Sequence, residues 1–497
     1  TATAFGFPDL PLIADMRGCR SGEVQNPAMQ CEYCEGYPQT SHAKSTFSLS
    51  PKETQCSRCP EDANCWGGDK ITPKSGYWRF ASHSSIFHKC PFDEACLEVS
   101  ESESRSMDYS QGKCKDGYYG NLCAECVDGW THTYHKECAP CSSAVFNIVK
   151  ALLFALIFIG FVFILVRLSL ARGRRTLLGA YLRIFADYLQ LIAITVSFEL
   201  NWPKMTQQYL GYQQRIGSLT NEAISVDCLL GTQGWRLVYK KLLTMVLLPV
   251  VLVIAAALVW FVVGRIRVAW RCNNKLLGTV VILLYLVHPN VVKTILASIS
   301  CKSFEDGDTY LYSDLNVACW KGEHAQWAAK VAFPGLIVWG FLLPLVMLLG
   351  VRRERENFQT DRARARYGYL LTGFSPEYYY WEFIVLYRKN VVATIAVFLY
   401  SSEPMLRALI VFGILFLSIF LQERTRPFLT PILNEMETRS LLVSMTTIYC
   451  GLHFLTSSST RGSDIFLFVL MVTINIYFLG YWLYYFRIEV ALGLKKS

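Results

Sequence analysis

Cysteines give this 497-residue chain its clearest chemistry, and 13 of the 18 lie in residues 1–141. The motifs CEYC (31–34) and CSRC (56–59) have the spacing of zinc ligands, which is one interpretation. With Cys228, Cys301 and Cys319, which we expect in outer loops, the exported side holds 16 cysteines. This even number in an exported compartment favours the other interpretation, a disulfide framework. We therefore expect an oxidised, disulfide-rich module. The sequence leaves the connectivity of eight cysteines open: Cys19, Cys31, Cys34, Cys56, Cys59, Cys65, Cys90 and Cys96.

A second group of candidate residues consists of ionisable side chains inside apolar stretches, where they are costly and often functional. These intramembrane charge candidates are Arg183, Asp187, Lys293, Glu382, Arg388 and Lys389. Arg183 and Asp187 are four residues apart and can pair on one helical face. We also hypothesise that Asp187 helps to neutralise Arg388 and Lys389 across a helix bundle, with Glu382 as a competing partner.

The basic pair Arg388 and Lys389 has three interpretations at this point. Both side chains can extend to the inner headgroups, form structural ion pairs, or take part in gating or an ion path. Lys293 follows Pro289, where a kinked helix can expose a carbonyl group and His288 near a cavity, although such a proline often reflects packing alone.

Familiar catalytic and cofactor-binding motifs are absent from the sequence, which has no glycine-rich phosphate loop, no HExxH and no GxSxG. We therefore expect no enzymatic activity, no cofactor and no metal site. Residues 1–141 carry a net charge of −6 and the remainder a net charge of +15, and 52% of all residues are hydrophobic. This division argues against a single globular enzyme and against a nucleic-acid binder.

The elements that must position these residues are apolar runs after Cys141, most of them near the roughly 20 residues of a membrane-spanning helix. The sixth and eighth of nine predicted runs are the weakest. The runs are Ala144–Val166, Leu177–Phe198, Leu242–Val263, Leu276–Ile299, Ala328–Gly350, Tyr380–Tyr400, Pro404–Leu421, Ser440–Leu455 and Ile465–Phe486.

Lysine and arginine in the loops predict the orientation, because basic residues accumulate on the inner side. With residues 1–141 outside, the inner segments carry 20 basic residues and the outer loops carry 5. We therefore expect an all-α membrane bundle of nine helices at 142–497, with an extracellular cysteine-rich module at 1–141. The N-terminus is outside and the C-terminus inside. Cys301 and Cys319 share one outer loop and are expected to pair.

Several segments together resemble one family. They are PKSGYWR (73–79), CKDGYYGNLCAEC (114–126), FELNWP (198–203), CKSFEDGDTYLYSDLNVACW (301–320), RARYGYLLTGFSPEYYYWEFIVLYRKN (364–390) and QERTRPFLTPILNEMETRSL (422–441). The family comprises protist and algal polytopic membrane proteins with ephrin-receptor-like or EGF-like cysteine modules. Their helical domain is called transient-receptor-potential-like or G-protein-coupled-receptor-related.

The resemblance also implies part of the disulfide pattern. Residues 114–138 resemble the second half of a laminin-type EGF module, which implies the pairs Cys114–Cys123 and Cys126–Cys138. With these assigned, Cys141 and Cys228 remain on the outer side. We predict that they form a bond that ties the cysteine module to the membrane domain.

For function, the resemblance implies a channel-like or mechanosensory membrane protein; the alternative is a non-conducting receptor or an anchor for a large extracellular assembly. Expected partners are membrane lipids, an extracellular protein or an upstream ectodomain, and for a channel a cation. Nucleic acid is not expected. We expect the chain to be the C-terminal part of a longer protein in the plasma or ciliary membrane.

One feature departs from a tetrameric channel of this type, which needs a re-entrant segment between its last two helices. Residues 456–464 are too short to hold one. The stretch Met205–Ile224 is expected to lie at the outer interface as a helix.

Overall fold

The computed structural model describes residues 18–27, 30–36, 45–104, 111–133, 137–170, 175–196, 198, 200, 202–217, 228, 236–266, 273–358, 360–399, 404–455 and 461–495. Residues 218–224 and 456–460, which the predictions above mention, lie outside them, as does Cys272. Contacts divide the chain into two units. The first is Thr1–Cys126 with Phe304–Gly307, and the second is Val127–Ser303 with Asp308–Ser497. The predicted boundary between residues 141 and 142 stays a prediction.

Short antiparallel hairpins build the first unit. Its paired strands are β1 (Glu23–Gln25) with β2 (Cys31–Tyr33), β3 (Thr46–Phe47) with β4 (Ser57–Arg58), β5 (Ala63–Gly67) with β6 (Lys70–Pro73), β7 (Tyr77–Trp78) with β8 (His88–Lys89), β9 (Cys96–Leu97) with β10 (Lys113–Cys114), and β11 (Tyr118–Tyr119) with β12 (Glu125–Cys126). Three single turns, η2 (Asp93–Ala95), α1 (Glu101–Ser104) and η4 (Asn121–Cys123), connect them. An isolated hairpin is marginally stable in water, so this unit needs other constraints.

Disulfides supply those constraints. The bonds are Cys19–Cys31, Cys34–Cys56, Cys59–Cys65, Cys90–Cys96 and Cys114–Cys123. All four cysteines of CEYC and CSRC are therefore bonded to sulfur, which leaves no thiolate for the zinc interpretation. The buried apolar core beside them is small and contains Phe47, Ala63, Cys65 and Ile71. Disulfide bonds stabilise this unit in place of a large apolar core, as they do in small disulfide-rich domains.

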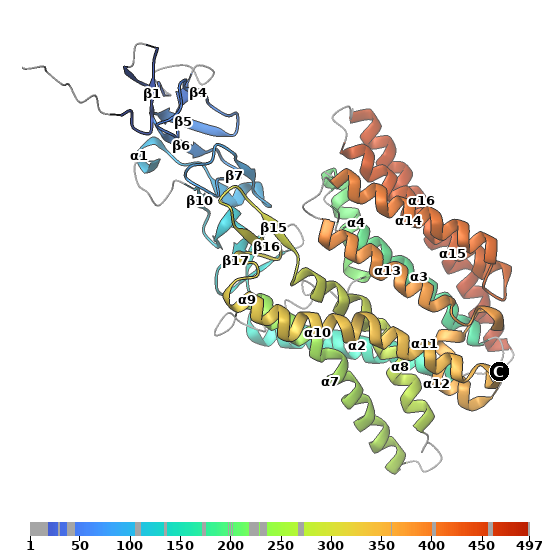
Figure 1. Cartoon of the computed structure of the whole chain (residues 1–497). Coiled ribbons are helices and arrows are strands. Elements are labelled where there is room, and N and C mark those ends of the chain that lie inside the picture. The colour runs from blue at the N-terminus through green and yellow to red at the C-terminus, as the bar shows by residue number, and fades with distance from the viewer. Residues whose placement is uncertain are drawn as a thin grey trace, which may run out of the picture. The chain divides into compact units, whose positions relative to one another are not determined.

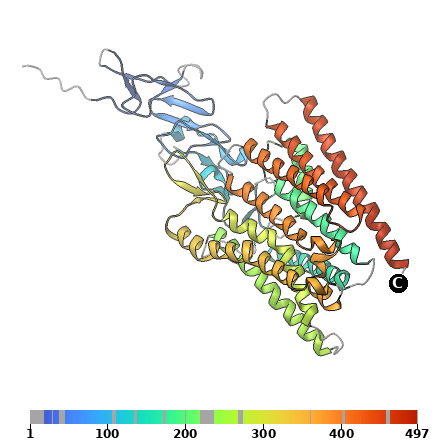
Figure 2. The ribbon, with the colours of Figure 1, turned by 45° about the vertical axis from the view of Figure 1, so that its right-hand side comes forward.

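The second unit is mostly helical (Figures 1 and 2). Its long helices are α2 (Ala144–Leu170), α3 (Arg175–Val196), α4 (Lys204–Gly217), α7 (Leu237–Ile266), α8 (Asn273–Ala297), α12 (Asp361–Leu371), α13 (Trp381–Phe398), α14 (Pro404–Thr425), α15 (Pro431–Phe454) and α16 (Arg461–Lys495). A further continuous rod combines α9 (Gly322–Trp327), η6 (Ala328–Ala332), α10 (Phe333–Gly335), η7 (Leu336–Leu342) and α11 (Leu343–Arg353). Single turns are η8 (Arg355–Asn357) and η9 (Pro376–Tyr378). Strands are β13 (Trp130–His132) with β14 (Cys138–Pro140), and the sheet β15 (Cys301–Ser303), β16 (Thr309–Leu311) and β17 (Asp314–Ala318).

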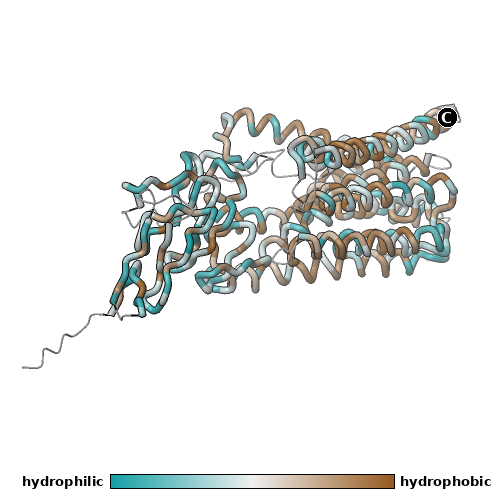
Figure 3. The backbone as a smooth tube through the Cα atoms, turned by 90° about the horizontal axis from the view of Figure 1, so that it is seen from above, coloured by the Kyte–Doolittle hydropathy of each residue, from teal (hydrophilic) through white to brown (hydrophobic). Residues whose placement is uncertain are grey.

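Within the described part of the chain, seven helices are long and apolar enough to cross a membrane, against the nine runs expected. They are Val145–Leu168, Leu177–Val196, Leu237–Arg265, Asn274–Ala297, Gly322–Arg353, Pro404–Thr425 and Gly462–Leu492. Figure 3 shows the hydrophobic colour along these rods. The two weakest predicted runs are helical as well, as α13 and α15, but both carry charged residues.

The helices differ in how much protein covers them. Only 11% of the most apolar window of α2 is buried, and the same holds for α7, whereas 67% is buried in α3 and in α8. Helices α13 and α15 contribute to two apolar cores that also contain α3. Central helices tolerate polar residues because neighbouring helices can pair them, while peripheral helices cannot. The interior of the bundle is therefore the place to search for a site.

Candidate functional site

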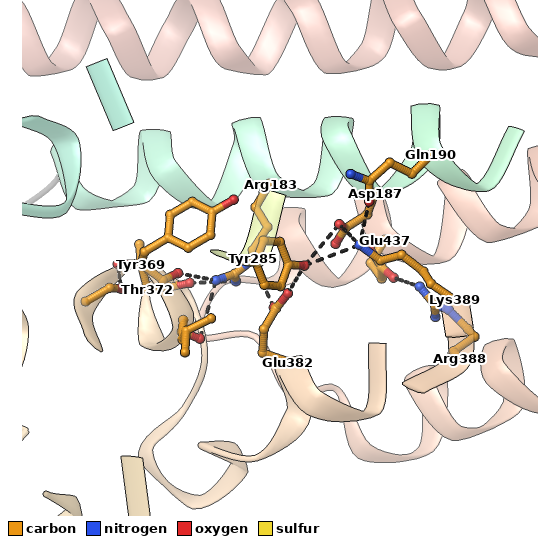
Figure 4. Close-up of polar contacts among 12 residues, drawn as sticks. Arg183, Asp187, Gln190, Tyr285, Tyr369, Thr372, Glu382, Arg388, Lys389 and Glu437 are labelled. Atoms are coloured by element: carbon orange, nitrogen blue, oxygen red, sulfur yellow. Dashed lines mark hydrogen bonds and ion pairs between the residues drawn. The ribbon is translucent and has the colours of Figure 1, made fainter. Parts of the chain in front are cut away.

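A buried charge network joins four helices in the interior of the bundle (Figure 4). Helix α3 contributes Arg183 and Asp187, α8 contributes Tyr285, α13 contributes Glu382, Arg388 and Lys389, and α15 contributes Glu437. Each long helix presents its polar group toward the others while apolar residues fill the rest of the contact. We call these seven residues the charge network.

The Lys389–Asp187 ion pair is one half of its centre. Lys389 Nζ lies 2.5 Å from Asp187 Oδ1, and the two side chains are 1% and 7% exposed. The same ammonium group donates to Gln190 Oε1 at 2.9 Å and to the Tyr285 hydroxyl at 3.4 Å. All three donor positions of an ammonium group are therefore used. Lys389 does not extend to the headgroups, which was one of its three interpretations.

Arg183 forms the other half and pairs with Glu382, although the sequence suggested Asp187. Its Nε lies 3.0 Å from Glu382 Oε2, with both side chains almost fully buried. The remaining guanidinium nitrogens donate to the carbonyl oxygens of Tyr369 at 2.6 Å and Thr372 at 2.8 Å, at the end of α12. A cation is favoured there because the last carbonyl groups of a helix carry partial negative charge.

Tyr285 connects the two pairs. Its hydroxyl donates to Glu382 Oε1 and also lies 3.2 Å from Asp187 Oδ1. A hydroxyl carries a single proton, so it can donate to only one carboxylate at a time. The hydroxyl group thus couples two ion pairs that the rest of the geometry keeps separate.

Arg388 takes a different partner from its neighbour. One of its terminal nitrogens lies 2.9 Å from Glu437 Oε1 on α15, and this carboxylate side chain is 2% exposed. The predicted pairing of Asp187 with both basic residues therefore holds for Lys389 only. Consecutive residues on a helix point about 100° apart, which explains why the two cations face different helices.

The charge network is formally neutral, with three cations and three carboxylates. Removing one partner of such a buried pair leaves an uncompensated charge, which costs about 3–5 kcal/mol. The charge network can hold four helices in one arrangement, and it can change that arrangement only by exchanging partners.

Lys293, the last predicted charge candidate, is half-buried on α8, eight residues beyond Tyr285 and therefore about 12 Å along the axis. The nearby His288 bonds through Nε2 to the carbonyl oxygen of Trp339 at 2.8 Å, within η7. This segment is a π-helix, where a carbonyl bonds the amide five residues later. That residue is Pro344, which has no N–H, so His288 replaces the missing donor.

The sequence did not reveal Tyr285, Gln190 or Glu437 as members of the site. The apolar run predicted from the sequence begins at Ser440, which leaves Glu437 outside it. In the structure α15 begins at Pro431, where the side chain of Thr430 caps the helix by accepting from the amide of Leu433. A capping threonine followed by proline was the available signal.

Two disulfides lie in the helical unit. Cys141 bonds to Cys228, which lies between α4 and α7, and Cys301 bonds to Cys319, as the sequence suggested. Cys126 and Cys138 are both disulfide-bonded.

A possible metal site is ruled out by the same bonding. Cys126, Cys138 and His132 are the one metal-like cluster among the described residues, and two of its three members are oxidised. Disulfide sulfur is a poor metal ligand because thiolate is required. Cys450, buried in α15, is the single free cysteine in the described ranges.

Comparison with known proteins adds one relative. The chain is 24% identical over 446 residues to cysteine repeat modular protein A of Toxoplasma gondii. The match covers 72% of this chain but 14% of the relative. No protein-family model and no solved structure matches. The chain therefore spans about a seventh of the length of the relative that it matches. It is similar to a cysteine-repeat protein and combines a disulfide-rich N-terminal region with apolar helices.

Proposed function

We propose that the protein crosses the membrane nine times, with the cysteine module outside and the C-terminus inside. The two helices beyond the seven apolar ones are α13 and α15, of 18 and 24 residues. At 1.5 Å per residue they are about 27 and 36 Å long, enough for a hydrocarbon core of roughly 30 Å. The charged residues of α13 and Glu437 of α15 are paired inside the charge network, and Glu435 and Arg439, near the start of α15, pair with each other. This pairing explains how both helices can be membrane-embedded without being apolar.

We propose further that the protein is channel-like or mechanosensory. The observation that carries it is the charge network, which stabilises one arrangement of α3, α8, α13 and α15 through partners that can be exchanged. Packed interfaces of this kind tend to have discrete alternatives, as a two-state element requires. The resemblance to transient-receptor-potential-like domains supports this function by analogy.

The Cys141–Cys228 bond supplies a path for mechanical input. Cys141 precedes α2, and Cys228 lies between α4 and α7, so tension on the chain before α2 is shared with a second point in the bundle. An extracellular protein or an upstream ectodomain would apply that tension. The plasma or ciliary membrane is the proposed location.

A non-conducting anchor is the second candidate, and one observation favours it. Every charged side chain of the network has a partner, and none is more than 10% exposed. Charges that line a conducting path need contact with water or with the ion. A paired, dry interior suits a bundle that resists force.

Ion flux in liposomes separates the two functions. The full chain is reconstituted, and cation flux is recorded with and without membrane tension. A conducting protein shows tension-dependent flux that Asp187→Asn changes and Glu435→Gln does not. Glu435 serves as the control, because it forms an exposed ion pair with Arg439 on α15. Flux that does not depend on tension contradicts the mechanosensory function, and no flux under voltage and tension favours the anchor.

A further inference from the structure

Helix α4 departs from its expected position at the outer interface. It packs along α3, and Leu210 is fully buried in the core that also holds Ile192, Cys450 and Met471 (Figure 1). An interfacial helix keeps its polar face in water. Here the polar residues Thr206 and Gln213, seven positions apart and so on one face, are 0% and 7% exposed.

The Gln213 amide reaches far into the bundle. Its Nε2 lies 3.0 Å from the Tyr209 hydroxyl, 3.4 Å from the Tyr188 hydroxyl and 3.4 Å from Asn475 Oδ1. Tyr188 itself donates to Asn475 Oδ1. Helices α3, α4 and α16 therefore meet at one polar cluster, which is separate from the charge network.

The depth of this cluster follows from its neighbours. Tyr188 lies eight residues before Val196, the outer end of its span, and Asn475 lies 13 residues after Gly462, the outer end of the other. At 1.5 Å per residue these separations are about 12 and 20 Å. Both values place the Gln213 amide near the middle of a core of roughly 30 Å. A helix of 14 residues that starts outside can reach this depth but cannot cross.

Two polar atoms on this buried face, Gln213 Oε1 and Thr206 Oγ1, have no hydrogen-bond partner among the described residues. Buried polar atoms are nearly always paired with protein or water. The Gln213 amide oxygen can accept a hydrogen bond, and the adjacent Tyr209 hydroxyl can donate its own proton, so a small neutral hydroxylic ligand matches both. Water is the smallest ligand with this chemistry.

We propose that α4 is a re-entrant helix that carries a water-binding site, centred on Gln213, to the middle of the membrane. The inference rests on the nine-span arrangement, which puts the start of α4 outside. Re-entrant segments are tolerated at this depth where protein buries them or where they line a hydrated cavity. In this arrangement the re-entrant segment lies between the second and third spans, α3 and α7, and not between the last two helices.

Cysteine accessibility tests the proposal in the full chain, reconstituted in nanodiscs. The thiol of Gln213→Cys is treated with a small, charged, membrane-impermeant methanethiosulfonate, and the unsubstituted chain gives the baseline. We expect at least tenfold faster modification than for Leu210→Cys, which is three residues away on the apolar core. If Gln213→Cys does not fold, Tyr209→Cys beside the same amide replaces it. Reaction as slow as that of Leu210→Cys overturns the water site.

Nitroxide depth measurements test the re-entrant placement separately. A spin label at position 213 is expected on the order of 12–20 Å below the outer headgroups. A label at headgroup depth overturns the proposal. Leu156→Cys, at the middle of the span Val145–Leu168 and 66% exposed, reports the bundle itself. A shallow label at 156 contradicts the spanning arrangement, whereas a deep label at 156 with a shallow one at 213 contradicts α4 alone.

Discussion

The ammonium nitrogen of Lys389 lies 2.5 Å from the Asp187 carboxylate, although 202 residues separate the two in the chain. Neither side chain has more than 7% of its surface exposed. The pair joins α3 to α13 at a depth where water cannot replace either partner. Its contribution to stability therefore depends on both charges being present.

Asp187→Asn should lower the free energy of unfolding by about 3–5 kcal/mol, because it leaves Lys389 buried and uncompensated. Adding Lys389→Met removes the second charge and should recover part of that loss. Thermal unfolding of both variants in detergent micelles gives the comparison. Equal stability of the single variant and the parent chain contradicts a buried ion pair.

Tyr285→Phe should destabilise the bundle by about 1–3 kcal/mol, since the carboxylate that accepts the hydroxyl proton, Glu382 or Asp187, loses a donor in a dry site. Tyr484→Phe on α16 is the matched control, because this ring is 62% exposed on the lipid side. The same unfolding measurement applies. If both variants lose the same stability, the effect comes from removing a tyrosine hydroxyl in general and not from the charge network.

Sequence patterns predicted the positions of the helices well because hydropathy over 20 residues is a strong signal. The sequence also suggested that Asp187 and Lys389, on two different helices, meet. The partner of Arg183 could not be deduced. Its selection of Glu382 depends on where α12 ends and on the direction of each side chain, neither of which spacing specifies.

The burial of α4 was not predicted, for a related reason. Its composition is polar enough for a surface helix, and only the contacts of Gln213 with Tyr188 of α3 and Asn475 of α16 show that this residue is buried. Glu437 was missed because the cap at Thr430 extends α15 beyond its apolar run. Tertiary contacts overrode local composition at each of these positions.

Peptide mapping without reductant should recover one cross-linked peptide that contains Cys141 and Cys228, the disulfide that closes the longest loop among the described bonds. Replacing both residues by serine should lower the free energy of unfolding by about 2–4 kcal/mol, because the unfolded chain gains freedom. A free thiol at either position in the parent chain would falsify the predicted staple.

Gly278→Ala should be poorly tolerated, because a Cβ there would overlap the carbonyl oxygen of Ala365 where α8 and α12 cross. Backbone atoms cannot move aside as a flexible side chain does, so the helices must separate, at a cost of about 1–3 kcal/mol. Gly413→Ala on α14 has nothing within 4 Å and is the control. Unfolding temperatures of the two variants in the same detergent provide the test, and similar values would contradict the close approach.

Asp314, in the sheet formed by β15, β16 and β17, should make stability depend on pH. Burial raises its pKa from the ordinary value of 3.8, although its carboxylate accepts the amide of Asn316 at 3.0 Å. The folded state then binds this proton more tightly than the unfolded state does. From pH 3.8 up to the raised value, the free energy of unfolding therefore falls as pH rises.

Asp314→Asn should remove that slope. Asparagine retains an oxygen that can accept the same amide, so only the charge changes. The direct measurement is a carbon-13 NMR titration of the full chain with labelled aspartate, in which the Asp314→Asn variant assigns the signal. A midpoint at or below 3.8 contradicts the raised pKa. A midpoint above 3.8 with an unchanged slope in the variant would mean that the pKa of Asp314 is equally high in the unfolded chain and that another group supplies the pH dependence.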